Sequence, residues 1–369
     1  SNPPTEYDIA TSAKPDDIKA LFPKARSVGE SFGVMLVREN EHMYDIATFR
    51  SDGPYSDHRH PDTIQFSDDK HDALRRDFTI NGMFEDPINE KIIDYVGGQD
   101  DIEQHIIRAI GDPRKRIAED HLRMLRAVRF AARFSFSIDP ETGEAIRQLA
   151  PELAGISRER IGEELKKMLT DPNRGVAAWE LQYLGLDRVI FAEQSCMNAP
   201  TRLGRLPASS SYATALAAWM IDRHTSEANV QEVASQWRSQ LLLSNRVYEE
   251  LRTILSLHQE LSLWDTLGTA KQKRIAASDQ CIGALAILQA EDRAGFVHIK
   301  RVITHLEQTG LAPEHFISGH DLLEAGLPPS STIGNVLEAV YDAQLEGSVT
   351  SREEALSFAM TIYQEFKDS

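Results

Sequence analysis

The stretch Arg75-Arg76-Asp77-Phe78-Thr79-Ile80-Asn81-Gly82 lies where the pattern of the sequence changes. Before it, short runs of β-branched and aromatic residues alternate with turn residues, which is typical of strands. These runs occupy residues 34–37, 44–49 and 63–66. After it, apolar residues recur at helical spacing over residues 102–107, 117–134 and 161–169. The sequence therefore predicts an α+β protein, with a small mixed α/β head followed by an all-helical neck, body and tail.

Two local signals in the head are specific. Lys14-Pro15-Asp16-Asp17 predicts the start of a short helix, which should end at Leu21-Phe22-Pro23 because proline lies near the start and just past the end. Residues 78–80, which follow the arginine pair, predict a further strand.

A chain of 369 residues exceeds the size at which one hydrophobic core stops growing, so several packed units are expected. Proline-containing breaks at residues 171–173 and 311–313 predict joints between helical modules. We predict a head over residues 1–86, a neck over 87–170, a body over 171–310 and a tail over 311–369.

The net charge of −17 argues against a globally basic nucleic-acid-binding surface, because phosphate contacts depend on Lys and Arg. Residues 108–133 are the exception, with eight basic and three acidic residues and a net charge of +5. A solvated helix face is the ordinary explanation of such a run. The motifs around it favour a local site for RNA or nucleotide instead.

No apolar run is long enough to span a bilayer, so no membrane contact is expected. Cys196 and Cys281 are too few for a disulfide framework and too far apart for a metal knuckle. They fit two buried thiols in a cytoplasmic protein.

Acidic residues near the N-terminus have a spacing that suits a metal site. Glu6 and Asp8 stand at positions i and i+2, so on a strand both carboxylates project from the same face. Mg²⁺ prefers carboxylates combined with nucleotide phosphates, although a solvated acidic terminus has the same letters. Asp45 lies near the middle of a strand-like segment. It is either a surface residue of an edge strand or a third carboxylate that faces the same metal.

The chain closely resembles the class II CCA-adding enzymes and bacterial poly(A) polymerases, whose motifs it contains in the same order. The resemblance rests on Glu6-Tyr7-Asp8, Ala47-Thr48-Phe49-Arg50, Arg75 to Gly82, Ile92 to Ile102, Glu119-Asp120-His121-Leu122-Arg123 with the residues up to Ala132, and Ser157 to Leu165. It weakens after about residue 186 and returns at residues 317–327 and 346–356.

This resemblance implies a nucleotidyltransferase that adds CMP and AMP from CTP and ATP to tRNA 3′ ends. It implies that Glu6 and Asp8 bind catalytic Mg²⁺ in a two-metal site and that Asp45 completes the catalytic set. A poly(A) polymerase that extends other RNA 3′ ends shares every head and neck motif, but the tail favours tRNA. A catalytically weak RNA-binding member of the family is a third possibility. No protein partner can be inferred.

The resemblance also assigns nucleotide-binding residues. Arg76 would contact the nucleotide, while Asp77 would position it or the sugar, or form a plain ion pair. Asp120 and Arg123, i and i+3 neighbours on a helix, would read the base edge. Arg123, Arg126, Arg129 and Arg133 fall within a sector of roughly 120° and would form a row for triphosphate and RNA backbone.

Two features depart from the family pattern. The family head opens with a Gly-Gly-x-Val-Arg-Asp segment about twenty residues before the acidic pair, and its backbone N–H groups cradle the triphosphate. The present sequence begins Ser1-Asn2-Pro3, so we expect residues 1–369 alone to bind nucleotide poorly. His320-Asp321 has no matching upstream histidines for a metal-dependent phosphohydrolase and predicts a helix cap.

Overall fold

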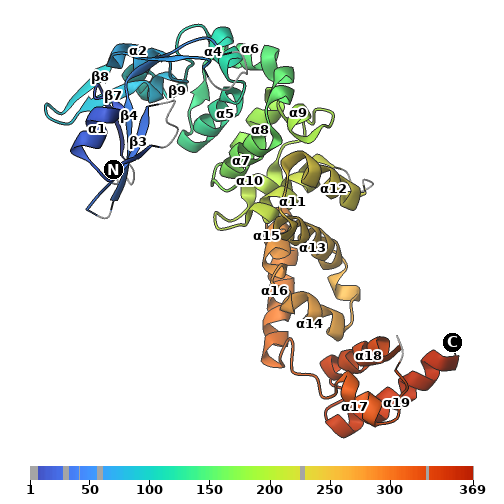
Figure 1. Ribbon diagram of the computed structural model, residues 1–369. Coiled ribbons are helices and arrows are strands. Elements are labelled where there is room, and N and C mark those ends of the chain that lie inside the picture. The colour runs from blue at the N-terminus through green and yellow to red at the C-terminus, as the bar shows by residue number, and fades with distance from the viewer. Residues whose placement is uncertain are drawn as a thin grey trace. The chain divides into compact units, whose positions relative to one another are not determined.

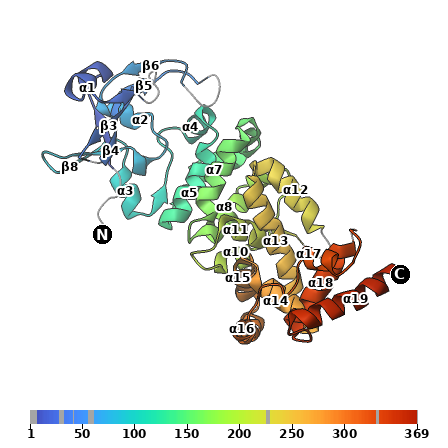
Figure 2. The same cartoon turned by 60° about the horizontal axis from the view of Figure 1, so that its bottom comes forward.

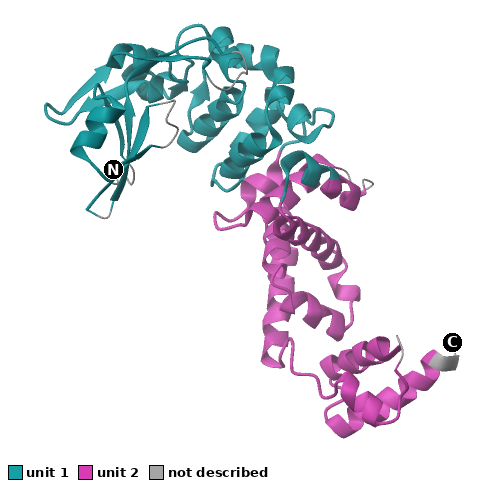
Figure 3. Ribbon diagram, viewed as in Figure 1, with its two compact units in different colours: residues 1–199, 236–243 teal, residues 200–235, 244–369 magenta. Residues whose placement is uncertain are grey.

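The computed structural model describes residues 7–27, 33–40, 42–55, 61–224, 229–329 and 332–368. The chain forms two compact units (Figure 3): residues 1–199 with 236–243, and residues 200–235 with 244–369. Helix α12 (Val230–Leu241) contributes residues to both units. The division into head, neck, body and tail remains a prediction.

A four-stranded sheet forms the centre of the head. Its strands are β1 (Asp8–Thr11), β2 (Arg26–Ser27), β3 (Val34–Glu39) and β4 (His42–Thr48), in the order β1-β4-β3-β2. β1 runs parallel to β4, and the other neighbours are antiparallel. Helix α1 (Pro15–Leu21) lies against this sheet (Figure 1) and buries Ile18 with Met35, Val37 and Ile46. The opposite face of the sheet is therefore left for the acidic residues.

The local signals in the first part of the chain are confirmed. Pro15 occupies the first turn of α1, and the backbone N–H of Phe22 donates to the carbonyl of Ile18 at the end of the helix. The strand-like runs at 34–37, 44–49 and 63–66 lie in or overlap β3, β4 and β6 (Ile64–Phe66). The α+β fold class is likewise confirmed.

Two of the elements predicted before residue 110 are wrong. Residues 79–81 form the 3₁₀ helix η2 (Thr79–Asn81) instead of a strand, and Phe78 makes a single bridge to Ala109. Residues 102–107, which were predicted to be helical, contain the end of α3 (Gly98–Glu103) and the short strand β9 (Ile106–Ile107). In both places a long-range strand pairing, with Ala109 or with β10 (Ser137–Ile138), overrides the local pattern.

The first unit also contains further short strands and a series of helices. They are β5 (Arg50–Asp52), α2 (Asp69–Leu74), β7 (Met83–Asp86), β8 (Lys91–Asp94), α4 (Pro113–Glu119), α5 (Arg123–Phe134), α6 (Pro140–Leu149), the 3₁₀ helix η3 (Ala150–Gly155), α7 (Arg158–Leu169), α8 (Arg174–Tyr183) and α9 (Asp187–Phe191). The hairpin β7–β8 spans the predicted boundary at residue 86. Helices α5, α7 and α8 pack together (Figure 2) around an apolar core that includes Leu125, Val128 and Leu165.

All regular secondary structure among the described residues of the second unit is helical. This unit holds α10 (Thr201–Arg205), α11 (Tyr212–Arg223), α13 (Asn245–Leu261), the 3₁₀ helix η4 (Trp264–Thr266), α14 (Thr269–Ala277), α15 (Cys281–Glu291), α16 (Arg293–Gln308), α17 (Gly319–Glu324), α18 (Thr332–Glu346) and α19 (Arg352–Asp368). Cys281 is buried, whereas Cys196 of the first unit is only half-buried. The hydroxyl of Ser318 accepts from the N–H of Asp321, whose carboxylate accepts from the N–H of Ser318, which confirms the predicted cap.

Among the described residues, no helix is both long enough and apolar enough to cross a membrane. This agrees with the absence of a long apolar run in the sequence.

Gly98, at the start of α3, provides a test of the packing between α3 and η2. A Cβ atom there would clash with the backbone carbonyl oxygen of Thr79 and with the side chain of Met83. We expect Gly98→Ala to lower the free energy of unfolding by roughly 1–3 kcal/mol, because backbone cannot move aside as a flexible side chain can. Urea denaturation measures the change. Gly155→Ala, with no heavy atom within 4 Å of the new methyl group, is the matched control. Equal stability of the two variants would contradict this packing.

Candidate nucleotide site

One cavity in the first unit, of about 770 Å³, gathers most of the charged residues that the sequence singled out. Five arginines and four aspartates line it, together with Tyr55, Pro61, Asn81 and Phe130. The charged residues are Arg50, Arg75, Arg76, Arg123 and Arg126, with Asp8, Asp52, Asp77 and Asp120. Strands β1 and β5 and helix α5 each contribute to the wall, so the cavity brings together residues more than a hundred positions apart.

The acidic residues of the sheet are adjacent. Asp8 on β1 pairs in register with Asp45 on β4, so the two side chains project from the same face of the sheet. Both are exposed, and neither forms an ion pair within the described part of the chain. Asp8 lines the cavity, whereas Asp45 is not among its lining residues. Glu6, the other member of the predicted metal pair, lies outside the described residues.

A buried carboxylate holds the arginine pair in place. Asp72 on α2 has a side chain only 2% exposed. Its Oδ1 accepts from Nε and Nη2 of Arg75 at 2.9 and 2.7 Å, and from the backbone N–H of Arg50 at 3.2 Å. Its Oδ2 accepts from Nε and Nη2 of Arg76 at 3.2 and 3.1 Å. Both guanidinium groups are thereby fixed at the wall of the cavity.

Asp77 forms the ion pair that the sequence left open as an alternative. Its Oδ2 accepts from Nε and Nη2 of Arg126 at 2.7 and 2.6 Å, and its Oδ1 accepts from the N–H of Phe78 and the amide of Asn81. Burial by itself raises the pKa of Asp77, but Arg126 and these hydrogen bonds lower it below its usual value. Asp77 is therefore an ionised anchor between the end of α2 and helix α5.

Asp120 and Arg123 both reach the cavity, but the predicted continuous helix over 117–134 is wrong. Helix α4 ends at Glu119 and α5 begins at Arg123, so Asp120 lies in the break. There its Oδ1 accepts from the N–H of Leu122 at 3.0 Å, and its Oδ2 accepts from Nη2 of Arg160 at 2.8 Å. In a continuous helix, the carboxylate of Asp120 would lie one turn before Arg123. Asp120 instead lies in the break between the two helices, and its side chain lines the cavity.

The predicted row of arginines is largely committed to internal contacts. Arg123 donates to Glu119, Arg126 donates to Asp77, and Nε of Arg129 donates to Oε2 of Glu164 at 2.6 Å. The guanidinium of Arg129 also lies 4.2 Å from the ring centroid of Phe130 and is absent from the cavity lining. The structure thus brings Arg123 and Arg126 to the cavity but turns Arg129 towards α7.

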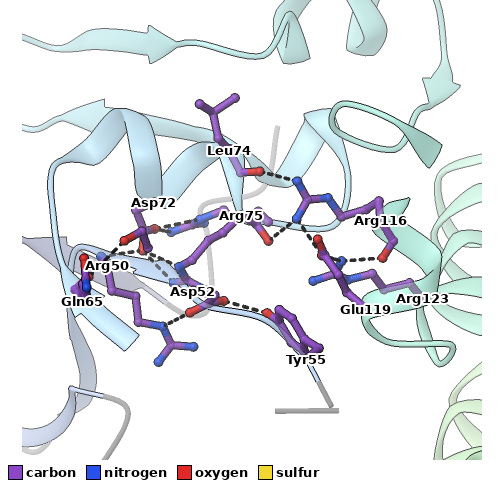
Figure 4. A network of polar contacts seen from close by, with 12 residues as sticks. Arg50, Asp52, Tyr55, Gln65, Asp72, Leu74, Arg75, Arg116, Glu119 and Arg123 are labelled. Carbon is purple, nitrogen blue, oxygen red and sulfur yellow. Dashed lines mark hydrogen bonds and ion pairs between the residues drawn. The ribbon is translucent and has the colours of Figure 1, made fainter. Parts of the chain in front are cut away.

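Several residues of the site were not singled out from the sequence. Figure 4 shows Asp52 between Arg50, Arg75 and Tyr55, whose hydroxyl donates to Oδ2 of Asp52 at 2.8 Å. Burial, with this hydrogen bond, raises the pKa of Tyr55 to about 12. Arg50 and Arg75 lie inside motifs that are recognisable in the sequence, and this is the one sequence feature that could have predicted them as site residues. Nothing in the local pattern marks Asp52 or Asp72.

Comparison with known proteins agrees with this arrangement. The family model for the poly(A) polymerase head domain matches residues 1–108, and that for the probable RNA and SrmB-binding site of polymerase A matches residues 135–197. The fold and the site therefore define a nucleotidyltransferase.

Its relatives identify the family. The CCA-adding enzyme of Bacillus licheniformis is 31% identical over 359 residues, which are 95% of this chain and 88% of that protein. The CCA-adding enzyme of Geobacillus stearothermophilus is 44% identical over 168 residues, 45% of this chain and 41% of that protein. The crystal structure of the Bacillus stearothermophilus CCA-adding enzyme in complex with CTP has a TM-score of 0.79 at 28% identity, covering 99% of this chain and 90% of that one. The chain belongs to the class II CCA-adding enzyme and poly(A) polymerase family.

The ion pairs of Asp77 and Glu164 predict a loss of stability in acid. Burial raises the pKa of Glu164 as well, but Arg129 and Lys167 lower it on balance. Because both folded-state pKa values lie below those of the unfolded chain, the unfolded state binds more protons in this range. Their contribution is therefore complete above pH of about 4–5 and is lost as pH falls below it.

We expect Asp77→Asn to lower the free energy of unfolding at pH 7 by roughly 1–3 kcal/mol and to flatten its decline between about pH 5 and pH 2. Urea denaturation across that range measures both effects. Glu103→Gln, at an exposed position on α3, is the control and should keep the wild-type slope. A wild-type pH profile in Asp77→Asn would contradict the ionised anchor.

Proposed function

We propose that this protein is a CCA-adding enzyme, which transfers CMP and AMP from CTP and ATP to the 3′ ends of immature tRNA. The observation that carries the proposal is the cavity in which Asp8 lies together with Asp120 and Arg123. A proposed metal ligand and a carboxylate–guanidinium pair in one cavity are what metal-dependent nucleotidyl transfer with template-independent base selection needs. The names of the relatives that match nearly the whole chain support tRNA as the acceptor.

The acidic face fits a divalent cation. Asp8 and Asp45 are exposed register neighbours, and within the described residues no cation already neutralises them. Carboxylate oxygens on one rigid strand pair match the preference of Mg²⁺ for hard ligands shared with nucleotide phosphates. We infer that Asp8 and Glu6 hold the metal and that Asp45 completes the site. When bound, Mg²⁺ lowers the pKa of the RNA 3′-hydroxyl and stabilises the leaving pyrophosphate.

Asp120 and Arg123 provide complementary groups for reading a base. A carboxylate oxygen accepts more than one hydrogen bond, so Asp120 can accept from an exocyclic amine while Arg160 and Leu122 hold it. In the described part of the chain, the hydrogen bonds of the Arg123 guanidinium all involve Nη1, which leaves Nε and Nη2 as donors for a base. The geometry allows both residues to act on the nucleotide without losing their supports.

The other arginines suit the sugar and phosphates. Arg76 keeps its guanidinium at the wall through Asp72, and its side chain is 31% exposed. The side chain of Arg126 is 34% exposed while paired with Asp77. We propose that both contact the nucleotide, with Asp77 holding Arg126 in position. Arg129 is left with a structural role in its pair with Glu164.

Poly(A) addition is the competing function, because the head-domain model that matches residues 1–108 is named for that enzyme. Incubation with tRNA transcripts that end before CCA, and with unstructured RNA, separates the two when each nucleotide is supplied alone. We expect CMP incorporation on the tRNA and little extension of unstructured RNA. Long AMP tails on both acceptors would assign poly(A) addition, and no incorporation at all would assign a silent RNA-binding protein.

The metal site generates one prediction. Asp8→Ala should abolish nucleotide incorporation and leave tRNA binding nearly intact, because a ligand of Mg²⁺ acts on the chemical step. Incorporation of labelled CMP and tRNA binding by fluorescence anisotropy measure the two properties. Asp16→Ala removes an exposed acid from α1, on the other face of the same sheet, and should keep wild-type activity. Wild-type turnover in Asp8→Ala would remove Asp8 from the mechanism.

The base-reading pair generates another prediction. Asp120→Ala or Arg123→Ala should erode discrimination among CTP, ATP, UTP and GTP more than it weakens RNA binding. The reason is that sites built on hydrogen bonds to a substrate reject analogues that leave polar groups unpaired. Ratios of kcat/KM for the four nucleotides measure the effect. Unchanged ratios in both variants would assign the pair to structure.

A further inference from the structure

Arg116 does not line the cavity, but it contacts several residues of the site. Its side chain is only 15% exposed. Nη2 donates to the carbonyl of Leu74 at 2.6 Å, Nη1 donates to the carbonyl of Arg75 at 3.1 Å, and Nε donates to the carbonyl of Ile110 at 3.1 Å. Burial lowers the pKa of this arginine, yet a guanidinium stays protonated at physiological pH. One buried cation therefore binds the backbone carbonyls at the C-terminal end of α2.

The same guanidinium also orients Glu119. Nη1 of Arg116 donates to Oε2 of Glu119 at 2.9 Å, and that oxygen also accepts from Nη1 of Arg123 at 2.5 Å. The backbone carbonyl of Arg116 accepts from the same Nη1 at 2.6 Å. Arg116 thus holds Arg123 in two ways. The backbone carbonyl of Arg116 binds Arg123 directly, and the side chain of Arg116 binds Glu119, which in turn binds Arg123. Figure 4 shows the three side chains converging beside the end of α2.

We propose that Arg116 is a positioning residue for nucleotide choice, which sets the orientation of Arg123 relative to the backbone of Leu74 and Arg75. This rests on the proposed base-reading role of Arg123. With Nη1 fixed on Glu119 and on a carbonyl, the planar guanidinium has one orientation, and Nε and Nη2 face the nucleotide in a defined geometry. The carbonyl of Arg75 has a fixed position from which Arg116 can be oriented, because Asp72 fixes the side chain of the same residue.

Lysine cannot reproduce these contacts. Its ammonium group is a single point donor, whereas the guanidinium reaches three carbonyls and a carboxylate from three separate nitrogens. In Arg116→Lys the charge remains but Glu119 loses its fixed partner. Arg123 can then follow Glu119 among several orientations, each of which presents its donors differently to a base.

The test compares nucleotide discrimination in folded variants of the protein. We expect Arg116→Lys to reduce the preference for CTP over UTP by about ten-fold. The preference is measured both as kcat/KM for addition to tRNA and as the ratio of Kd values by calorimetry. Glu119→Gln, which breaks the charged link while preserving shape, should reduce it to a similar extent. Because the two residues act through one path, the double variant should fall short of the product of the single effects.

Arg158 supplies the matched control. Its Nη1 also donates to backbone carbonyls, those of Val189 and Ile190 at the end of α9, but it lies outside the cavity lining. Arg158→Lys should lose stability comparably and keep wild-type nucleotide preference. Wild-type preference in folded Arg116→Lys and in Glu119→Gln overturns the proposal, and so does equal loss in Arg158→Lys.

The calorimetric arm separates this inference from the function on which it rests. Absence of CMP transfer by the wild-type protein would count against CCA addition, while a ratio of Kd values that depends on Arg116 would still support the positioning role. Equal Kd values for all four nucleotides in the wild-type protein would overturn it.

Discussion

Repulsion among arginines is the constraint on which the site depends. Five guanidinium groups line one cavity, and bringing like charges together out of water is costly unless each has a counter-charge. The chain places that counter-charge behind the arginines, in Asp72, Asp77 and Glu119. Under the proposed function, a nucleoside triphosphate would meet cations that are already oriented, so less conformational entropy would be lost on binding.

This arrangement explains why each arginine has a different status. Arg76 and Arg126 remain about one-third exposed, although each pairs with a buried carboxylate through Nε and Nη2. Arg129 is nearly enclosed, since Glu164 lies on the neighbouring helix and Phe130 covers one face of the group. Helical periodicity treats Arg126 and Arg129 as equivalent members of one row. The carboxylates on neighbouring elements, which periodicity does not include, decide which of them reach the cavity.

The sequence predicted the fold class, helix α1 and the main strands because their signals are local. It also identified Asp8, Asp120 and Arg123, which the structure places around one cavity. It failed where distant pairing decides: at η2, which Phe78 links to Ala109, and at β9, which pairs with β10. Asp52 and Asp72 were missed for the same reason. Their importance lies in contacts with Arg50, Arg75 and Tyr55, which no spacing in the sequence encodes.

Helix α12 limits how the molecule can be divided. Its second half belongs to the first unit, where the ring of Trp237 stacks at 3.9 Å on Phe191 and its indole N–H donates to Glu193. Leu241 adds a backbone contact that leaves no room for a side chain at Gly162. A fragment ending at residue 199 would lose this covering and expose Phe191, although every residue of the cavity would be present. A chimera with a relative that divides the chain at residue 199 must therefore keep the second half of α12 together with the first unit that it covers.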